Sequence, residues 1–406
     1  MKVAVIGGGW AGIAAAVELT AAGADTTLYE AGRVLGGRAR SIAIDGRTLD
    51  NGQHILLGAY RETLALMRQV GADPETLFDR RPLQIIDNSG FRLALPILPA
   101  PLNVAWGLLT ATGVGLGEKL RTAIWMDGIK RRRFQLPADI TVAQWLDNDG
   151  QTGQLRSHLW EPLCLAALNL PAERASAQLF ANVLRDSLGS PRREDTDLLL
   201  PRVEFGQLLP EPAANWLSSH GTKLLFGKRI GHIAPDQNGL LIDGEIFTSA
   251  VLATAPQHAT TLWPELTINC DFEPIATVYL QFGPKISLAF PLLNLLGKHG
   301  QWVVDRSNGL LACVLSGHGD WEALDDAALT TSLEEELGFP EKAHWHRVVR
   351  EKRATFSARP ALHRPDCTTS NPRLFLAGDY TWADYPATLE GAVRSGRRAA
   401  RRALTC

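Results

Sequence analysis

Two stretches near the start of the chain have the pattern of buried strands, with a helical pattern between them. Residues 3–6 (Val-Ala-Val-Ile) form a short unbroken apolar run, which is typical of a strand buried on both faces of a parallel sheet. Ile13, Ala16 and Val17 then recur at helical spacing, and residues 26–29 follow as a second strand. The opening of the chain therefore predicts a strand, a tight turn, a helix and a strand.

The pattern changes after this unit and later returns. Residues 60–200 favour helices punctuated by Pro and Gly, without strand–helix alternation, which indicates an inserted region. Runs of strand-forming residues then predict that the first sheet resumes. These runs lie at residues 224–226, 230–233, 240–242 and 250–253.

Further along, the pattern predicts a second sheet and a closing strand–helix pair. A helix is expected over residues 325–337, a buried strand over 374–377, and a helix from Thr388 onward. The strands of the second sheet are expected at residues 277–282, 302–304 and 310–315. No internal repeat is present.

Composition excludes several classes of protein. The chain has 406 residues, 45% of them hydrophobic, and can bury a core divided among about two or three domains. A formal net charge of −2 gives no reason to expect nucleic acid as a partner. Five scattered cysteines without a Cys-x-x-Cys pair argue against disulfides and against a metal site, and favour a cytoplasmic setting.

The first residues superficially resemble a signal peptide, because a basic start precedes an apolar run that reaches Ala16. Three glycines at residues 7–9 and the charge of Glu18 argue against secretion. No run of about 20 apolar residues exists, so no membrane-spanning helix is expected.

Gly7-x-Gly9-x-x-Gly12 is the first motif that indicates chemistry. Gly7 permits a tight turn, Gly9 lets the backbone approach a pyrophosphate, and Gly12 lets the helix pack on the strand. Trp10 and Ala11 open the helix, whose N-terminus favours a phosphate. The alternative is an ordinary glycine-rich turn.

Two later features favour FAD over NAD. Glu30 ends the second predicted strand, where a carboxylate accepts hydrogen bonds from ribose hydroxyls and disfavours a 2′-phosphate. Gly36 and Gly37 let the chain pass close to a cofactor, and Arg38 can pair with the pyrophosphate or approach the flavin. A solvated loop arginine is the alternative for Arg38.

Residues 51–54 (Asn-Gly-Gln-His) supply a turn and polar groups that could meet the flavin ring. Gly52 provides the turn. His54 is expected either to contact the flavin and take part in catalysis or to be an ordinary hydrogen-bonded histidine.

The carboxyl end supplies the second half of the expected site. Gly378 and Asp379 follow an apolar strand and can place a carboxylate against the ribitol of FAD. Glu390, Gly391 and Ala392 lie near a helix start, whose amides and dipole can face the flavin. Their distance from the first glycines is typical of a discontinuous FAD domain.

These motifs resemble those of the flavin-containing amine oxidase and phytoene desaturase superfamily. Other stretches resemble, more narrowly, the squalene-associated FAD-dependent desaturase group, which includes hydroxysqualene dehydroxylase. The narrower resemblance lies in residues 50–60, 95–102, 160–169, 200–202 and 210–212. It covers nearly the whole chain and implies reductive removal of the hydroxyl of hydroxysqualene to give squalene in hopanoid biosynthesis, with hydride passing from reduced flavin N5 to an allylic carbon.

The resemblance also implies site residues and partners. An external reductant is expected, because no second nicotinamide fingerprint is present. The candidate proton donors are His54, Asp384, Tyr380 and Glu161. The expected cofactor contacts are Gly7, Gly9, Trp10, Ala11, Gly12, Glu30, Gly37, Arg38, Gly52, His54, Ile230, Gly378, Asp379, Glu390, Gly391 and Ala392.

The expected fold is α/β, with a discontinuous Rossmann-like FAD-binding domain of the two-dinucleotide-binding-domain type and an inserted α+β substrate domain. The FAD domain is expected to comprise residues 1–75, 201–262 and 361–406. A mainly helical region (76–200) and a sheet-containing region (263–360) form the substrate side.

An isoprenoid substrate raises the question of membrane contact. Residues 93–117 carry no charge but are interrupted by Pro and Gly, which is compatible either with a tunnel lining or membrane-dipping segment or with a buried helix pair. The basic residues 130–133 could anchor the enzyme on the inner face of the cytoplasmic membrane or form a solvated loop. On the last helix, a stripe of small residues should pack on the sheet, with arginines opposite.

Two other classes of function remain open. One is a carotenoid-type desaturase or an amine oxidase, in which the flavin runs in the oxidising direction. The other is a non-enzymatic isoprenoid-binding protein that has lost FAD, against which the retention of both Glu30 and Asp379 argues.

Overall fold

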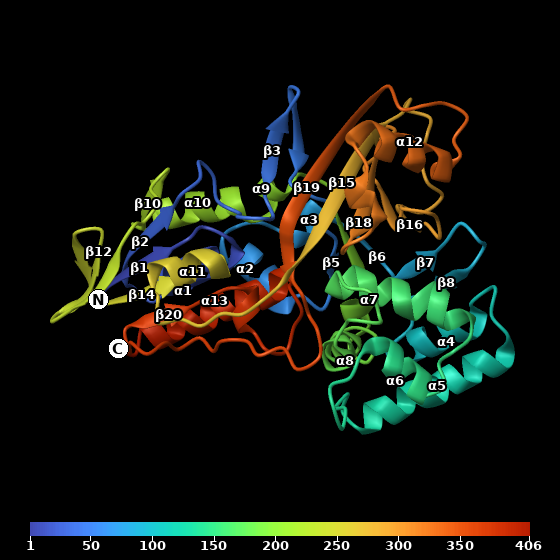
Figure 1. Ribbon diagram of the computed structural model, residues 1–406, viewed down its shortest axis with the longest axis horizontal. Coiled ribbons are helices and arrows are strands. Elements are labelled where there is room, and N and C mark those ends of the chain that lie inside the picture. Colours follow the sequence, from blue (N-terminus) through green and yellow to red (C-terminus); the bar gives the residue numbers. More distant parts are fainter.

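A five-stranded parallel sheet organises the first part of the molecule. The computed structural model describes residues 1–406, and in it the strands run in the order β10-β2-β1-β14-β20, all parallel (Figure 1). Strands from three distant parts of the chain therefore share one sheet. Their bounds are β1 Lys2–Ile6, β2 Asp25–Glu30, β10 Lys223–Phe226, β14 Ser249–Leu252 and β20 Leu374–Leu376.

Helices α1 (Trp10–Ala21) and α13 (Leu389–Ala403) pack against each other and against this sheet. A Cβ on Gly396 would lie 2.0 Å from the carbonyl oxygen of Ala11, so the small-residue stripe of α13 is needed for contact with α1. The stripe also meets the sheet, where Ser249 Oγ donates to the Ala403 carbonyl. The first and last helices are thereby joined, and both termini lie at one end of the molecule (Figure 1).

The arginines on the other side of α13 are held by carboxylates of the protein. Arg394 pairs with Glu390, Arg397 with Glu62, Arg398 with Asp366 and Arg401 with Glu18. These ion pairs agree with the interpretation of this side of α13 as a charged face that needs no lipid partner.

One part of the sheet prediction was wrong. Residues 224–226 and 250–252 join the parallel sheet, but β11 (Ile233–Asp236), β12 (Gly239–Ile242) and β13 (Glu245–Phe247) form a separate antiparallel sheet, and the first of these strands begins at Ile233 rather than at residue 230. Two-residue turns connect these strands, and such turns produce hairpins, whereas parallel neighbours need long crossovers.

The predicted second sheet is present and antiparallel, with strand order β16-β17-β18-β15-β19. The predicted helix is α12, Asp326–Leu337. The strands are β15 Phe272–Gln281, β16 Leu292–Asn294, β17 Trp302–Asp305, β18 Leu310–Ser316 and β19 Trp345–Phe356.

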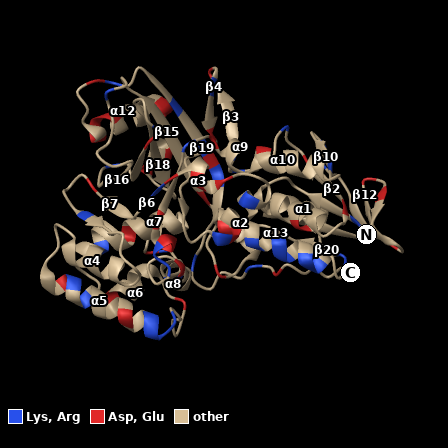
Figure 2. Ribbon diagram, turned by 180° about the vertical axis from the view of Figure 1, so that it is seen from behind, with Lys and Arg blue, Asp and Glu red and all other residues tan.

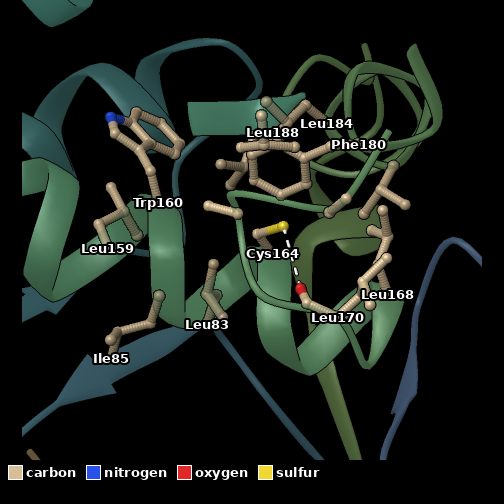
Figure 3. Packing of buried hydrophobic residues seen from close by; sticks show 14 of the residues in the cluster. Leu83, Ile85, Leu159, Trp160, Cys164, Leu168, Leu170, Phe180, Leu184 and Leu188 are labelled. Atoms are coloured by element: carbon tan, nitrogen blue, oxygen red, sulfur yellow. Dashed lines mark hydrogen bonds between the residues drawn. The ribbon is translucent and has the colours of Figure 1, made fainter. Parts of the chain in front are cut away.

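The helical region lies beside this second sheet (Figure 1). Trp160 and Phe180 are almost completely buried in its core, with Cys164 Sγ 3.7 Å from the Leu170 carbonyl oxygen (Figure 3). Its helices are α4 Leu102–Thr110, α5 Leu116–Arg131, α6 Val142–Asn148, a π-helical turn Arg156–Trp160, α7 Glu161–Leu168 and α8 Ala177–Asp186. No helix of the structure combines the length and apolar character needed to cross a bilayer.

Short strands that the pattern did not predict also occur in the first 201 residues. A hairpin, β3 with β4, follows the glycine-rich segment, and the remaining strands form two small antiparallel sheets. These strands are β3 Ser41–Ile44, β4 Arg47–Asp50, β5 Leu56–Leu57, β6 Phe78–Arg81, β7 Gln84–Ile86, β8 Arg92–Ala94 and β9 Leu198–Pro201. The remaining helices are α2 Arg61–Gln69, α3 Pro74–Leu77, α9 Phe205–Leu208, α10 Pro210–Ser219 and α11 Pro256–Leu262.

Candidate functional site

Four strands of the parallel sheet end at the same edge, and each leads to residues that can contact a ligand. Gly7 follows β1, Glu30 ends β2, Thr254 lies just beyond β14, and Gly378 lies just beyond β20. In open α/β sheets, ligands bind outside the carboxyl ends of the strands. The fold thus gathers the two predicted halves of the site at one edge.

The glycines of the first turn differ in what surrounds them. A Cβ on Gly7 would lie 2.6 Å from the Ala253 carbonyl oxygen, and one on Gly12 would lie 1.8 Å from the Gly7 carbonyl oxygen. Protein packing therefore requires both glycines. A Cβ on Gly9 would meet no protein atom closer than 4.0 Å, the distance to Gly37 Cα, so the space beside Gly9 is open.

The first turn of α1 presents free hydrogen-bond donors at this open space. The amide of Ile13 donates to the Gly9 carbonyl, but the amides of Trp10, Ala11 and Gly12 donate to no protein group. The Trp10 indole is buried and its Nε1–H donates to the Ala39 carbonyl at 2.9 Å. The helix start therefore offers backbone donors and a positive dipole end, which suit an anion.

The Glu30 carboxylate borders the same turn. It accepts hydrogen bonds from the amides of Gly8, at 2.7 Å, and Gly32, at 2.6 Å. Each oxygen keeps further acceptor capacity. The segment after β10 approaches Glu30, because the Lys228 amide donates to the Glu30 carbonyl. Ile230 lies on the same segment, but the Ile230 side chain is buried in the small core beside β11–β13.

Arg38 and Asp379 form an ion pair across the site, with 2.7 Å between Nη2 and Oδ2, although they are 341 residues apart in sequence. Gly37 precedes Arg38 with a positive φ of 59°. Burial lowers the pKa of Arg38, but the Asp379 carboxylate outweighs this and leaves the pKa raised. The structure therefore brings the two ends of the chain together.

Tyr380, next to Asp379, is buried and its hydroxyl donates to the Thr254 carbonyl at 3.2 Å. Burial, together with the Asp379 carboxylate, raises the pKa of Tyr380, so its hydroxyl keeps its proton at neutral pH. Two buried polar atoms of the neighbouring segments, Thr254 Oγ1 and Trp382 Nε1, have no protein partner. Unpaired buried groups of this kind indicate a place for a polar ligand or water.

The start of α13 is more constrained than the sequence suggested. The Gly391 amide donates to Thr388 Oγ1 and the Ala392 amide to the Thr388 carbonyl, so the free donors are the amides of Leu389 and Glu390. The Glu390 side chain is fully buried and turned towards α2.

Gly52 and His54 lie between the first glycine turn and the second sheet. His54 Nδ1 is 2.9 Å from the Gly52 carbonyl oxygen, and its ring packs against Phe205, which also contacts Trp10. Burial lowers the pKa of His54, so the neutral form dominates at neutral pH. A Cβ on Gly52 would meet no protein atom within 3.6 Å; its nearest neighbour is Thr277 Oγ1 at 3.7 Å.

The other two candidate proton donors have different surroundings. Asp384 is exposed on the loop between Tyr380 and α13. Glu161 opens α7 in the helical region and forms an ion pair with Arg156 at 2.6 Å. Neither side chain contacts the gathered residues at the sheet edge.

Arg364 holds the loop that carries Asp384. Its guanidinium donates to the carbonyls of Ala383 and Tyr385 and has no carboxylate partner. Burial lowers the pKa of Arg364 to about 10, although Asp379 and Asp384 oppose this shift. The loop between β20 and α13 is therefore held by a partly buried arginine that has no carboxylate partner.

Comparison with known proteins decides the family. The sequence profile described as flavin containing amine oxidoreductase matches residues 10–404. The chain belongs to this flavin-containing amine oxidoreductase family. It is accordingly an FAD-dependent oxidoreductase, and the structure agrees with the expected Rossmann-like fold.

Individual relatives of this flavin-containing oxidoreductase extend over the full chain. Hydroxysqualene dehydroxylase of Rhodopseudomonas palustris is 31% identical, over 98% of this chain and 97% of the relative. The enzyme of the same name from Sinorhizobium fredii is 28% identical, over 100% of this chain and 98% of the relative. Zeta-carotene desaturase of a Synechocystis strain is 26% identical, over 100% of this chain and 97% of the relative.

Solved structures show the same fold at lower identity. An oxidoreductase from Methanosarcina mazei has a TM-score of 0.76 at 15% identity, over 99% of this chain and 100% of that one. Putrescine oxidase bound to putrescine has a TM-score of 0.69 at 18% identity, over 100% of both chains.

The residues at the sheet edge fit FAD. Gly9 faces space that no protein atom fills, the α1 amides beside it are unpaired, and Thr254 Oγ1 is a buried atom without a partner. A dinucleotide presents phosphates and sugar hydroxyls, which are the groups that such donors and acceptors bind.

Two residues of this site were missed by reasoning from the sequence. Thr254 follows a predicted buried strand directly, and a polar residue at that position was a usable signal. No sequence pattern indicated Arg364, because its role depends on the loop carbonyls that it contacts in the folded protein and on the lack of a carboxylate partner.

Proposed function

We propose that the chain removes the hydroxyl of hydroxysqualene reductively to give squalene. The observation that carries the proposal is the match over the whole chain to enzymes named hydroxysqualene dehydroxylase, at 31% and 28% identity.

In this proposal, FAD is held along the carboxyl edge of the parallel sheet. The α1 amides and Arg38 face the pyrophosphate, Glu30 the ribose, and Asp379 the ribitol. Gly52, His54 and the free amides of Leu389 and Glu390 lie toward the flavin end. When reduced, FAD supplies the hydride that forms the new C–H bond.

The chain itself must supply a proton, because the C–O bond breaks and the hydroxyl leaves as water. We assign this role to Tyr380, because its hydroxyl lies at the carboxyl edge of the sheet, 3.2 Å from the carbonyl oxygen of Thr254, a residue whose own hydroxyl has no partner. Glu161 is paired with Arg156 and Asp384 faces solvent, which makes both of them weaker candidates. His54 is the alternative donor, and the pH dependence of the rate distinguishes it from Tyr380. A dry pocket around the reacting carbon would exclude competing water.

An anaerobic assay tests the proposal. Purified enzyme with chemically reduced FAD is mixed with hydroxysqualene, and the extracted lipid is analysed by mass spectrometry. Squalene is the expected product, and it should be absent with oxidised FAD.

The alternative is a carotenoid-type desaturase, which the match to zeta-carotene desaturase favours. Oxidised enzyme that dehydrogenates squalene or phytoene, without any squalene from the reductive assay, would replace the first proposal by the second.

A further inference from the structure

Exposed apolar side chains gather on one part of the helical region. Seven of the twelve exposed large hydrophobic side chains in the structure lie within residues 97–124. They are Ile97, Leu102, Trp106, Leu109, Leu116, Leu120 and Ile124, with exposed fractions between 51% and 76%. Such clustering, unlike scattered single residues, marks an interaction surface.

Helical spacing places six of these side chains on one stripe of α4 and one stripe of α5. Leu102, Trp106 and Leu109 are three to four residues apart on α4. The large exposed apolar residues of α5 are Leu116, Leu120 and Ile124, at four-residue spacing. We call these residues together with Ile97 the α4–α5 apolar face. α4 contains no charged residue at all.

The face is fixed in place and cannot turn inward. A Cβ on Gly107 would lie 2.4 Å from Leu95 Cδ2, so α4 is seated closely on the strand β8 segment. On α5, Trp125 and Ile129 are buried on the opposite side. The outer side of α4 is therefore apolar, and α5 exposes an apolar stripe among its charged residues, which a helix in water does not favour.

Basic residues adjoin this face. Lys130, Arg131, Arg132 and Arg133 are exposed at the C-terminal end of α5, where Figure 2 shows blue segments. Lys130 and Arg133 have no carboxylate partner, whereas Arg131 pairs with Asp127 and Arg132 lies 3.7 Å from Asp149.

The acidic residues of α5 do not cancel this charge. Glu118 is turned inward and accepts from the Leu155 amide at 2.6 Å, and Asp127 is occupied by Arg131. The end of α5 therefore keeps unpaired positive charge beside an apolar face.

We propose that the α4–α5 apolar face docks on a lipid bilayer that carries anionic headgroups. The apolar stripes would enter the headgroup–acyl boundary to a depth of roughly 5–10 Å. Trp106 suits the interface, and the cations at the end of α5 match anionic headgroups. This inference goes beyond the proposed reaction, because it concerns how the protein binds a surface and not what it reduces.

Vesicle co-sedimentation tests the docking. The holoenzyme is mixed with vesicles of phosphatidylcholine alone or with phosphatidylglycerol added. We expect binding to the anionic vesicles that weakens at high salt. The double variant L120Q/I124Q should bind about tenfold more weakly.

Matched variants separate the contributions. The control I246Q/L296Q changes two exposed apolar residues outside the α4–α5 apolar face and should bind as the parent does. The variant K130E/R133E should lose binding to anionic vesicles more than binding to phosphatidylcholine. Flavin content and thermal unfolding should be unchanged in all three, because the altered side chains are exposed.

Equal vesicle binding by the parent and L120Q/I124Q would overturn the proposal. Absence of lipid binding, with a concentration-dependent dimer that L120Q/I124Q abolishes, would instead assign the face to a second copy of the chain. Both outcomes are independent of squalene formation, which can be assayed with detergent-dispersed substrate.

Discussion

The three glycines of the first turn serve different physical needs. Gly7 and Gly12 are required because backbone atoms of the protein lie where a Cβ would be. Gly9 adopts φ −71° and ψ 177°, which any residue can adopt, and no protein atom crowds it. A need for glycine at position 9 would therefore come from a bound group and not from the protein itself.

This difference predicts opposite behaviour of two alanine variants. Gly12→Ala should lower the free energy of unfolding by about 2 kcal/mol or more through overpacking. Gly9→Ala should change it by less than about 0.5 kcal/mol, yet weaken FAD binding about tenfold or more. Urea unfolding of the apoprotein and titration with FAD measure the two effects. Normal FAD affinity in Gly9→Ala would contradict our cofactor placement.

The assignment of the proton donor predicts a pH profile. Burial lowers the pKa of His54 below 6.5 and raises that of Tyr380 above 10. With Tyr380 as donor, single-turnover rates should stay level between about pH 7 and pH 9, and Tyr380→Phe should lose most activity while keeping its flavin. A donor with the lowered pKa of His54 would be deprotonated throughout that range, and the rate would fall as the pH rises.

Sequence patterns predicted the residues whose role depends on their position relative to a neighbouring strand. Gly7, Glu30 and the Gly378-Asp379 pair follow strands, and their positions at one sheet edge follow from parallel topology. Arg364 could not be foreseen, because its burial depends on the loop that it holds, and the same is true of the hydrogen bonds that occupy the Gly391 and Ala392 amides.

At the scale of elements, a buried carboxylate joins the last helix to an early one. Glu390, in the first turn of α13, accepts from the amides of Glu62 and Thr63 at the start of α2 and from the Thr63 hydroxyl at 2.8 Å. It also pairs with Arg394 at 2.8 Å. The carboxylate therefore satisfies donors that the N-terminus of α2 would otherwise leave unpaired.

Replacing this carboxylate should be costly. Glu390→Gln is expected to destabilise the protein by about 3 kcal/mol, because an amide accepts fewer of these hydrogen bonds and leaves Arg394 without its charge partner. Glu335→Gln, at an exposed position on α12, is the control and should be neutral. Denaturant unfolding monitored by circular dichroism gives both values, and an equally small effect in the two variants would show that the carboxylate is dispensable.

Helices and strands could be predicted where one hydrophobic periodicity continues over the whole element. The prediction was less successful where short strands alternate with turns. The buried runs at β1 and β20 were identified correctly, because short unbroken apolar runs are typical of strands buried in a parallel sheet. For β11–β13 the strand propensity was recognised, but the sheet assignment failed because short turns, not strand composition, decide between parallel and antiparallel partners.

At the scale of the whole molecule, the helical region and the parallel sheet meet through the loop before α13. Asn182 of α8 donates to the Asp384 carbonyl at 3.0 Å, and the Tyr385 hydroxyl donates to Asp186, also on α8. The segment that follows Asp379 is thus attached to the region with the large apolar core. No sequence pattern indicated this connection, because its partners are about 200 residues apart and individually unremarkable polar residues.

The parallel sheet takes its central strand from the beginning of the chain and an edge strand from residues 374–376. The ribosome makes β1 long before it makes β20. A growing polypeptide that already displays the glycine turn still lacks Asp379 and the start of α13, so FAD capture must wait until these residues have been made. Nascent chains that contain only the first strands should therefore bind FAD much more weakly than chains that include α13.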